Sequence, residues 1–282
     1  IATGDGITIA HELGAEIKNL SYIQFHPTGF NNKHTRETFL ISESVRGEGA
    51  YLKNCNGERF MQNYDDRLEL APRDVVSHAI MAEAKKTGSD KFYLDITHKD
   101  PEFVRNRFPM INEKLLEAGY DMTKEPIPIF PCQHYLMGGI NVDYQAETNV
   151  PGLYAAGECS HTGVHGNNRL ASNSLMEALV FSRRAALDIA KKMEQAPDTF
   201  ELREFPLDPD AKPLPAGFRT EIRNILQNNY FVIPNEEKLL ESFERVKEIR
   251  RILNTEHYIV DENYIEAKSL ATVAYLILKE VI

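Results

Sequence analysis

The sequence is poor in the features that mark several large classes of protein. It has only three cysteines, none in the CxxC spacing of a zinc or redox site. An odd number of unpatterned cysteines predicts reduced thiols, as in a cytoplasmic protein. No apolar run is long enough to cross a membrane, since charged residues interrupt the most apolar segment, 265–282. We therefore expect neither a membrane protein nor a disulfide-rich secreted one.

Positive charge is also scarce. The chain has 32 Lys and Arg against 42 Asp and Glu, which gives a formal net charge of -10. Without a basic run, this balance argues against nucleic-acid binding. A net-negative protein also repels an anionic substrate, so such a substrate would require arginines gathered at its site.

Several catalytic motifs are missing as well. No GxSxG nucleophile elbow occurs, and the dinucleotide fingerprint GxGxxG does not follow any strand pattern. His161 and His165 are four residues apart, but Gly163 and Gly166 place them in a loop without the H-E-x-x-H arrangement of a zinc helix. We therefore predict no metal site.

The most informative stretch that is present covers residues 152–177. Its pattern predicts an apolar strand over 152–158, a loop carrying Arg169, and a helix from about 175 to 193. Ser174 and Glu177 have the spacing of a capping box, and Leu175 and Leu179 begin an apolar stripe along the helix. A glycine-rich turn that leads into a helix N-terminus favours an anionic or electron-rich ligand, and Arg169 adds a fork suited to a carboxylate.

The rest of the chain predicts a mixture of helices and strands. We expect a turn and helix from residue 3, a strand over 22–26, a hairpin turn at Asn56-Gly57, a helix over 75–86 and a strand over 91–96. A proline-rich linker after 195 precedes three helices, near 216–230, 236–254 and 262–281. Arg73 lies at a helix N-terminus, where a cation is electrostatically unfavourable, and is therefore a candidate functional residue.

Six motifs occur in one order: Gln24-Phe-His-Pro-Thr28, Glu43-x-x-Arg-Gly-Glu-Gly49, Arg73-Asp-Val-Val76, His134-Tyr-x-Met-Gly-Gly139, Gly152-Leu-Tyr-Ala-Ala-Gly-Glu158 and His165-Gly-x-Asn-Arg169. This series resembles the fumarate reductase/succinate dehydrogenase flavoprotein superfamily over residues 1–195, and more weakly beyond. Within it, Asn168-Arg-Leu-Ala-Ser-Asn-Ser-Leu175 resembles the L-aspartate oxidase family, since succinate dehydrogenases typically read NRLGANSLLD there.

The resemblance implies an α/β fold made of three parts. These are the C-terminal part of an FAD-binding Rossmann-type domain (1–20 and 132–195), an inserted α+β capping domain (21–131) and a C-terminal helical bundle (196–282). Because the chain opens on Ile1 without a GxGxxG half, we expect a piece of a longer protein. Alone, this piece is expected to bind FAD poorly and to be inactive.

The resemblance also assigns roles to particular residues. Arg73 is implied as the catalytic residue that handles the proton. The implied substrate-binding residues are His26, Ser42, Arg46, His134 and Arg169. The implied FAD-binding residues are Asp5, Glu158, Ser174 and Leu175.

The implied reaction is the FAD-dependent oxidation of L-aspartate to iminoaspartate, the first step of NAD biosynthesis. Hydride passes from Cα to flavin N5, and oxygen or fumarate reoxidises the flavin. Quinolinate synthase is an implied partner, and the oligomeric state is left open. The alternatives are a flavoprotein subunit of fumarate reductase or succinate dehydrogenase, and a binding module without catalysis.

Overall fold

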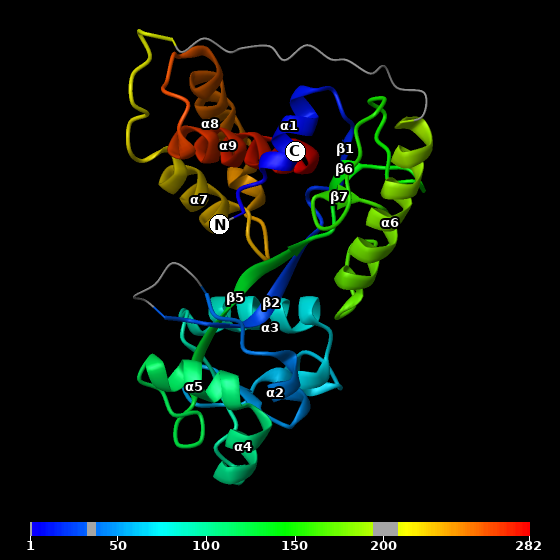
Figure 1. The fold of residues 1–282 in the computed structure, drawn as a ribbon. Coiled ribbons are helices and arrows are strands. Elements are labelled where there is room, and N and C mark those ends of the chain that lie inside the picture. Colours follow the sequence, from blue (N-terminus) through cyan, green and yellow to red (C-terminus); the bar gives the residue numbers. More distant parts are fainter. Residues whose placement is uncertain (1, 33–37, 194–207) are drawn as a thin grey trace. The chain divides into compact units, whose positions relative to one another are not determined.

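The computed structural model describes residues 2–32, 38–193 and 208–282. The chain divides into two compact units, which we call the insert unit (Gln24–His134) and the split unit (Ile1–Ile23 with Tyr135–Ile282). Figure 1 gives the elements of both. The predicted capping segment, 21–131, begins three residues before the start of the insert unit and ends three residues before its end. The predicted boundary at 195–196 lies outside the described residues.

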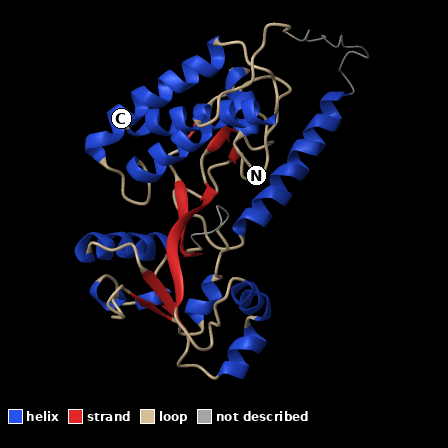
Figure 2. Cartoon of the chain, turned by 90° about the vertical axis from the view of Figure 1, so that its left-hand side faces the viewer, coloured by secondary structure: helices blue, strands red, loops and turns tan. Residues whose placement is uncertain are grey.

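The insert unit is built on a four-stranded sheet (Figure 2). Its strands are β2 (Ile23–Phe30), β3 (Tyr51–Lys53), β4 (Phe92–Asp95) and β5 (Ile127–Leu136), in the order β2-β5-β4-β3. β4 pairs antiparallel with both neighbours, so Leu94 lies opposite Leu52 on one side and Ile127 on the other. Alternating burial along β5 shows that one face of the sheet packs inward.

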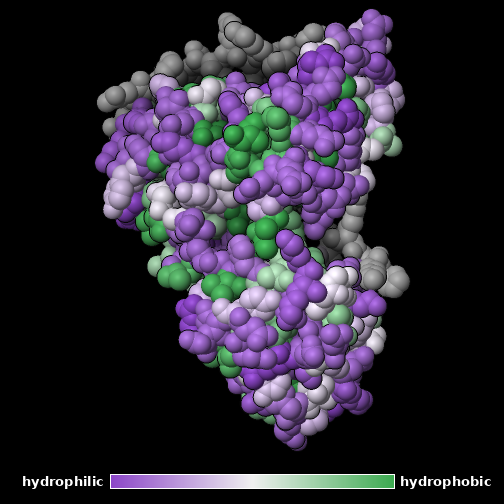
Figure 3. Space-filling model, turned by 180° about the vertical axis from the view of Figure 1, so that it is seen from behind, coloured by the Kyte–Doolittle hydropathy of each residue, from purple (hydrophilic) through white to green (hydrophobic). Residues whose placement is uncertain are grey.

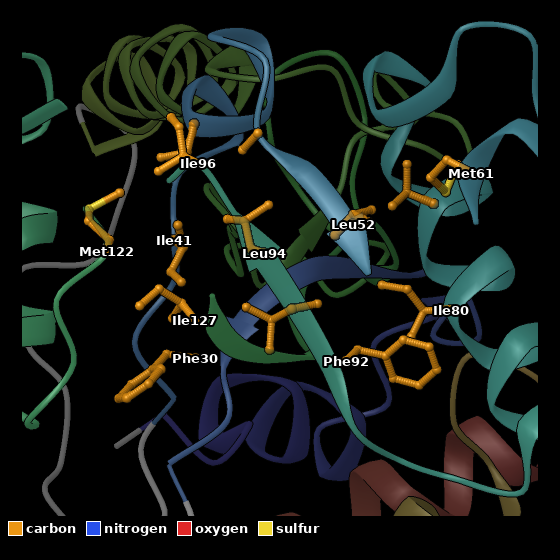
Figure 4. Close-up of a cluster of buried hydrophobic side chains, with 14 of the residues drawn as sticks. Phe30, Ile41, Leu52, Met61, Ile80, Phe92, Leu94, Ile96, Met122 and Ile127 are labelled. Atoms are coloured by element: carbon orange, nitrogen blue, oxygen red, sulfur yellow. The ribbon is translucent and has the colours of Figure 1, made fainter. Parts of the chain in front are cut away.

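Helices cover this sheet and complete its core. They are α2 (Glu43–Gly47), α3 (Arg73–Thr87), α4 (Pro101–Arg107) and α5 (Pro109–Glu117), with short 3₁₀ turns η1 (Met61–Asn63) and η2 (Leu68–Leu70). On α3, Val76, Ala79 and Ile80 share one face and are buried with the strand residues shown in Figure 4. Asp100 caps α4 by accepting from the Phe103 N–H.

The split unit contains a smaller sheet and five helices among its described residues. Strand β6 (Gly139–Asn141) pairs antiparallel with β1 (Ile17–Lys18) and parallel with β7 (Ser160–His161). The helices are α1 (Asp5–Glu12), α6 (Asn173–Met193), α7 (Phe218–Asn229), α8 (Glu236–Thr255) and α9 (Glu262–Val281). The three helices predicted after the linker are thus confirmed as α7, α8 and α9.

The bundle helices pack through the apolar stripe that the sequence predicts. On α8, Val246, Ile249 and Leu253 are fully buried, and each contributes about 1.5–3 kcal/mol by leaving water. They meet α9 where it carries small residues, including Ala267 and Ala271. Helix α1 also packs on α9.

The predicted strand over residues 152–158 is wrong. Within it, Tyr154 makes one isolated bridge, to Glu147. The backbone of Leu153 and Ala155 instead pairs with the loop before it, and Gly157 turns the chain with a φ of 83°. These local bonds hold the segment as a loop.

Helix α6 differs from the local pattern at its apolar stripe and at its predicted capping box. Leu175 and Leu179, which begin the predicted apolar stripe, are each 69% exposed, so the face that packs is the one with Phe181 and Ala185. Glu177, predicted to cap the helix with Ser174, lies on the same buried face. Its carboxylate accepts hydrogen bonds from the Tyr135, Thr162 and His165 side chains, so tertiary donors have replaced the local cap.

Figure 3 shows hydrophilic residues over most of the face seen from behind, with apolar residues gathered in patches. No helix within the described ranges is long and apolar enough to span a bilayer. The cysteines are free thiols, and burial raises the pKa of Cys132 to about 11.

Gly138 lies against the backbone of Asn19 and Leu20, and it provides a test of the fold. A Cβ at this position would lie 1.9 Å from the carbonyl oxygen of Asn19. The Asn19 carbonyl belongs to the backbone and cannot rotate away from an added methyl group as a flexible side chain could. We therefore expect Gly138→Ala to lower the free energy of unfolding by about 2–3 kcal/mol. Thermal unfolding of the full-length protein measures this.

The matched control is Gly6→Ala, because a Cβ at Gly6 in α1 meets no atom within 4 Å. That change should stabilise the protein by up to about 1 kcal/mol, as alanine favours helix over glycine. Equal melting temperatures for the two variants would contradict the close approach.

Candidate active site

Four predicted site residues gather in the insert unit, and we call them the basic cluster: His26, Arg46, Arg73 and His134. His26 lies on β2 and His134 on the neighbouring strand β5, and their rings meet edge to face at 5.5 Å between centroids. Arg73 is the first residue of α3, and Arg46 lies on α2. The charges of both arginines act on His26. Folding thus unites residues that are far apart in the sequence.

Arg73 is held on two sides. Its Nε donates to Glu43 Oε2 at 2.8 Å, and its Nη1 donates to Gln24 Oε1 at 3.2 Å. Its side chain is 13% exposed. Two fixed acceptors orient the planar guanidinium, which leaves its remaining N–H groups for a carboxylate.

Glu43 and Gln24 were not among the predicted site residues. Both stand inside quoted motifs, beside Ser42 and His26 respectively, so the signal was present in the sequence. Ser42 itself is the N-cap of α2, where its hydroxyl oxygen accepts from the Ser44 N–H and hydroxyl. Its own hydrogen can therefore be donated to a ligand.

His26 is a neutral hydrogen-bond donor. Burial, and then the charges of Arg73, His134 and Arg46, lower its pKa to about 3. The Thr28 N–H donates to Nδ1 at 3.3 Å, so the single proton of the neutral ring lies on Nε2. An imidazole in this form can donate to a carboxylate oxygen without changing charge.

Arg46 is the most deeply buried arginine of the cluster. Its side chain is 1% exposed, and its Nη1 donates to the backbone oxygen of Glu69. Nη2 lies 3.9 Å from Glu43 Oε2. Burial lowers the pKa of Arg46, with Glu43 opposing this shift, yet a guanidinium remains charged in proteins. Arg46 therefore adds positive potential to the cluster from inside the unit.

A second group of predicted residues lies in the split unit. The guanidinium of Arg169 lies 4.3 Å over the ring of Tyr135, and its Nη1 donates to the Leu170 oxygen at 3.2 Å. Glu158 accepts from the Leu136 N–H at 3.1 Å. Desolvation raises the pKa of Glu158, and this outweighs the Leu136 bond and the charge of Arg169. Tyr135, which stands inside a quoted motif beside His134, was not among the predicted site residues.

The predicted FAD-binding residues also lie in the split unit. Ser174 and Leu175 are in the first turn of α6, and Leu175 is 69% exposed. Asp5 opens α1 and accepts from the Thr3 hydroxyl at 2.7 Å. A helix N-terminus beside an exposed apolar side chain fits a flat ring with polar edges, as in a flavin. The individual contacts stay predictions. Within the described ranges, no three His, Cys, Asp or Glu residues gather as metal ligands.

The lowered pKa of His26 has a measurable consequence for stability. Its folded pKa, about 3, is below the unfolded value of 6.5, so the unfolded state binds the extra proton between these values. The contribution of His26 to stability is therefore complete above pH 6.5 and declines by about 1.4 kcal/mol per pH unit below it.

Urea unfolding of the full-length protein and of His26→Gln, from pH 8 to 4.5, measures this contribution. The difference in unfolding free energy between the two should stay constant above pH 7 and decrease below pH 6.5. A constant difference down to pH 4.5 would show that His26 titrates normally.

Comparison with known proteins agrees with this geometry. The family described as FAD binding domain matches residues 1–175. L-aspartate oxidase of Acinetobacter baylyi is 41% identical over 99% of this chain and 52% of its own length. That of Clostridium perfringens is 56% identical over 72% of this chain and 45% of its own. Among solved structures, E. coli quinol fumarate reductase superposes with a TM-score of 0.83 at 28% identity, covering 98% of this chain and 53% of that one.

The chain spans about half the length of the curated relatives it matches. The family match covers more than half of the chain and includes all of the predicted site residues. The chain therefore belongs to the FAD-binding domain family, and its predicted α/β fold, its FAD cofactor and its likeness to the L-aspartate oxidases are confirmed.

Proposed function

We propose that the protein containing this chain oxidises L-aspartate to iminoaspartate, using FAD, as the first step of NAD biosynthesis. The basic cluster is the observation that supports this most strongly. It concentrates positive charge within a chain of net charge -10, which is what a dianionic substrate requires. Relatives that cover the chain are named L-aspartate oxidase.

The cluster suits a substrate carboxylate in three ways. Arg73 offers a guanidinium already oriented by Glu43 and Gln24. Neutral His26 offers its Nε2–H, and buried Arg46 adds positive charge. Preorganised donors lose little entropy when the substrate binds, so they hold Cα in a reactive position.

When bound, FAD supplies the acceptor for the hydride that leaves Cα. We propose that Arg73 holds a substrate carboxylate and maintains the proton balance at the neighbouring carbon, with Glu43 fixing its guanidinium. His134, Ser42 and Arg169 are proposed as further substrate ligands. Asp5, Glu158, Ser174 and Leu175 are proposed to contact FAD.

The wider setting of the reaction follows from the same proposal. Oxygen or fumarate would reoxidise the flavin. Because an imine hydrolyses in water, quinolinate synthase is proposed as the partner that receives iminoaspartate. We propose a cytoplasmic location, and domain limits at 20, 131 and 195.

A flavoprotein subunit of fumarate reductase or succinate dehydrogenase is the second candidate, because the structural likeness is to quinol fumarate reductase. Two assays on the full-length protein separate the candidates. The proposed oxidase forms hydrogen peroxide and an imine from L-aspartate in air, whereas the alternative oxidises succinate with an artificial electron acceptor. Succinate oxidation without L-aspartate oxidation would overturn the proposal.

Arg73→Leu tests the catalytic assignment. Because the change removes a proton-handling group that also binds a carboxylate, L-aspartate turnover in the full-length protein should fall about 10²–10⁴-fold. Steady-state oxidation of L-aspartate, followed by oxygen uptake, measures the loss.

Arg67→Leu is the matched control. Arg67 belongs to the same unit, but its side chain is 58% exposed and is paired with Asp65. It should leave turnover within about twofold, as surface substitutions usually do. Unchanged turnover in Arg73→Leu would remove the catalytic assignment.

A further inference from the structure

Glu177 is a buried carboxylate in the split unit, with 2% of its side chain exposed. Three side chains converge on it. Oε2 faces the Tyr135 hydroxyl at 3.2 Å and His165 Nε2 at 2.8 Å, and Oε1 accepts from the Thr162 hydroxyl. All three groups are able to donate, and an ionised carboxylate can accept at both oxygens.

Such an arrangement is costly to build. Removing a carboxylate from water requires several kcal/mol unless it is hydrogen-bonded on all sides, and each bond lost leaves part of that cost uncompensated. Glu177 lies on the inward face of α6, four residues before buried Phe181. It therefore ties two segments to this helix, the strand end at Tyr135 and the loop containing Thr162 and His165.

Tyr135 connects this carboxylate to a substrate-binding candidate. The ring of Tyr135 supports the guanidinium of Arg169, with 4.3 Å between the guanidinium carbon and the ring centroid. On another side, the ring of His165 meets it edge to face at 5.6 Å. Because Glu177 holds both the Tyr135 hydroxyl and His165, it fixes the platform on which Arg169 rests.

We propose that Glu177 is a positioning residue, which sets the orientation of Arg169 through Tyr135 and so determines how tightly a ligand carboxylate binds. The inference rests on the proposed substrate role of Arg169. The carboxylate does not touch the substrate. Its effect is on the geometry of the cation that does.

Glu83 offers a matched control in the insert unit. Its side chain is also 2% exposed, and it also accepts from a tyrosine hydroxyl, Tyr64, at 2.8 Å. The ring of Tyr64 packs edge to face on Phe60. Glu83 thus shares the burial and bonding of Glu177 but supports apolar core.

The probe is malonate, a dicarboxylate that neither proposed enzyme can dehydrogenate. Calorimetric titration of the FAD-loaded full-length protein gives its dissociation constant. Glu177→Gln should weaken malonate binding about tenfold, as expected when a charge-assisted hydrogen bond loses its alignment. Glu83→Gln should lower the melting temperature similarly but leave malonate affinity within about twofold.

A double-mutant cycle separates positioning from a general structural effect. In an Arg169→Ala background, Glu177→Gln should cause no further loss of malonate affinity, because the cation it orients is gone. An independent, multiplicative loss would overturn the proposal. So would unchanged affinity in the single variant.

Tyr135→Phe removes the hydroxyl but keeps the ring, and it serves if Glu177→Gln does not fold. It should weaken malonate binding in the same direction, and unchanged affinity would again contradict the role of Glu177. Wild-type protein that shows these couplings but does not oxidise L-aspartate would overturn the proposed function and leave this inference intact. Failure of the wild type to bind malonate would overturn both.

Discussion

The burial of positive charge is the constraint on which the insert unit's site depends. Arg46 is 1% exposed, and the Glu69 backbone oxygen and the Glu43 carboxylate offset part of the cost of burying this cation. Burial, reinforced by the charges of Arg73 and Arg46, keeps His26 neutral and lowers its pKa to about 3. One packing arrangement, of β2, β5, α2 and α3, therefore produces both the charge and the neutral donor that a carboxylate ligand would meet.

The split unit contains the opposite arrangement, a buried anion that organises donors. Glu177 holds Tyr135 and His165, and the Tyr135 ring supports Arg169. In both units, a charged group that is expensive to bury is retained near an arginine proposed to bind substrate. Two local sequence rules do not hold here. Arg73 is a cation at a helix N-terminus, and Glu177 bonds to distant side chains instead of capping its helix. Such departures are expected where function competes with stability.

The parts of the fold that depend on short-range pattern could be predicted from the sequence. The bundle helices α7 to α9 follow from apolar spacing, whereas the members of the basic cluster were assigned only through the family resemblance of their motifs. The contacts that could not be predicted join residues that are distant in the sequence. Glu177 is 42 residues from Tyr135, and Arg73 is 49 residues from Gln24, so no local window could show that these side chains meet. The exposed Leu175 and Leu179 show the same limit, since periodicity predicts a stripe but not which face is covered.

The central claim is that the proposed substrate-binding residues recognise a ligand with two carboxylates. Competing titrations of the full-length, FAD-loaded protein with malonate and with propionate, which has the same number of carbon atoms, test it most directly. If these residues bind both carboxylates of the ligand, malonate should bind about 10–100-fold more tightly than propionate. This factor is the contribution of one additional charge-assisted carboxylate contact. Equal affinities for the two acids would contradict the account.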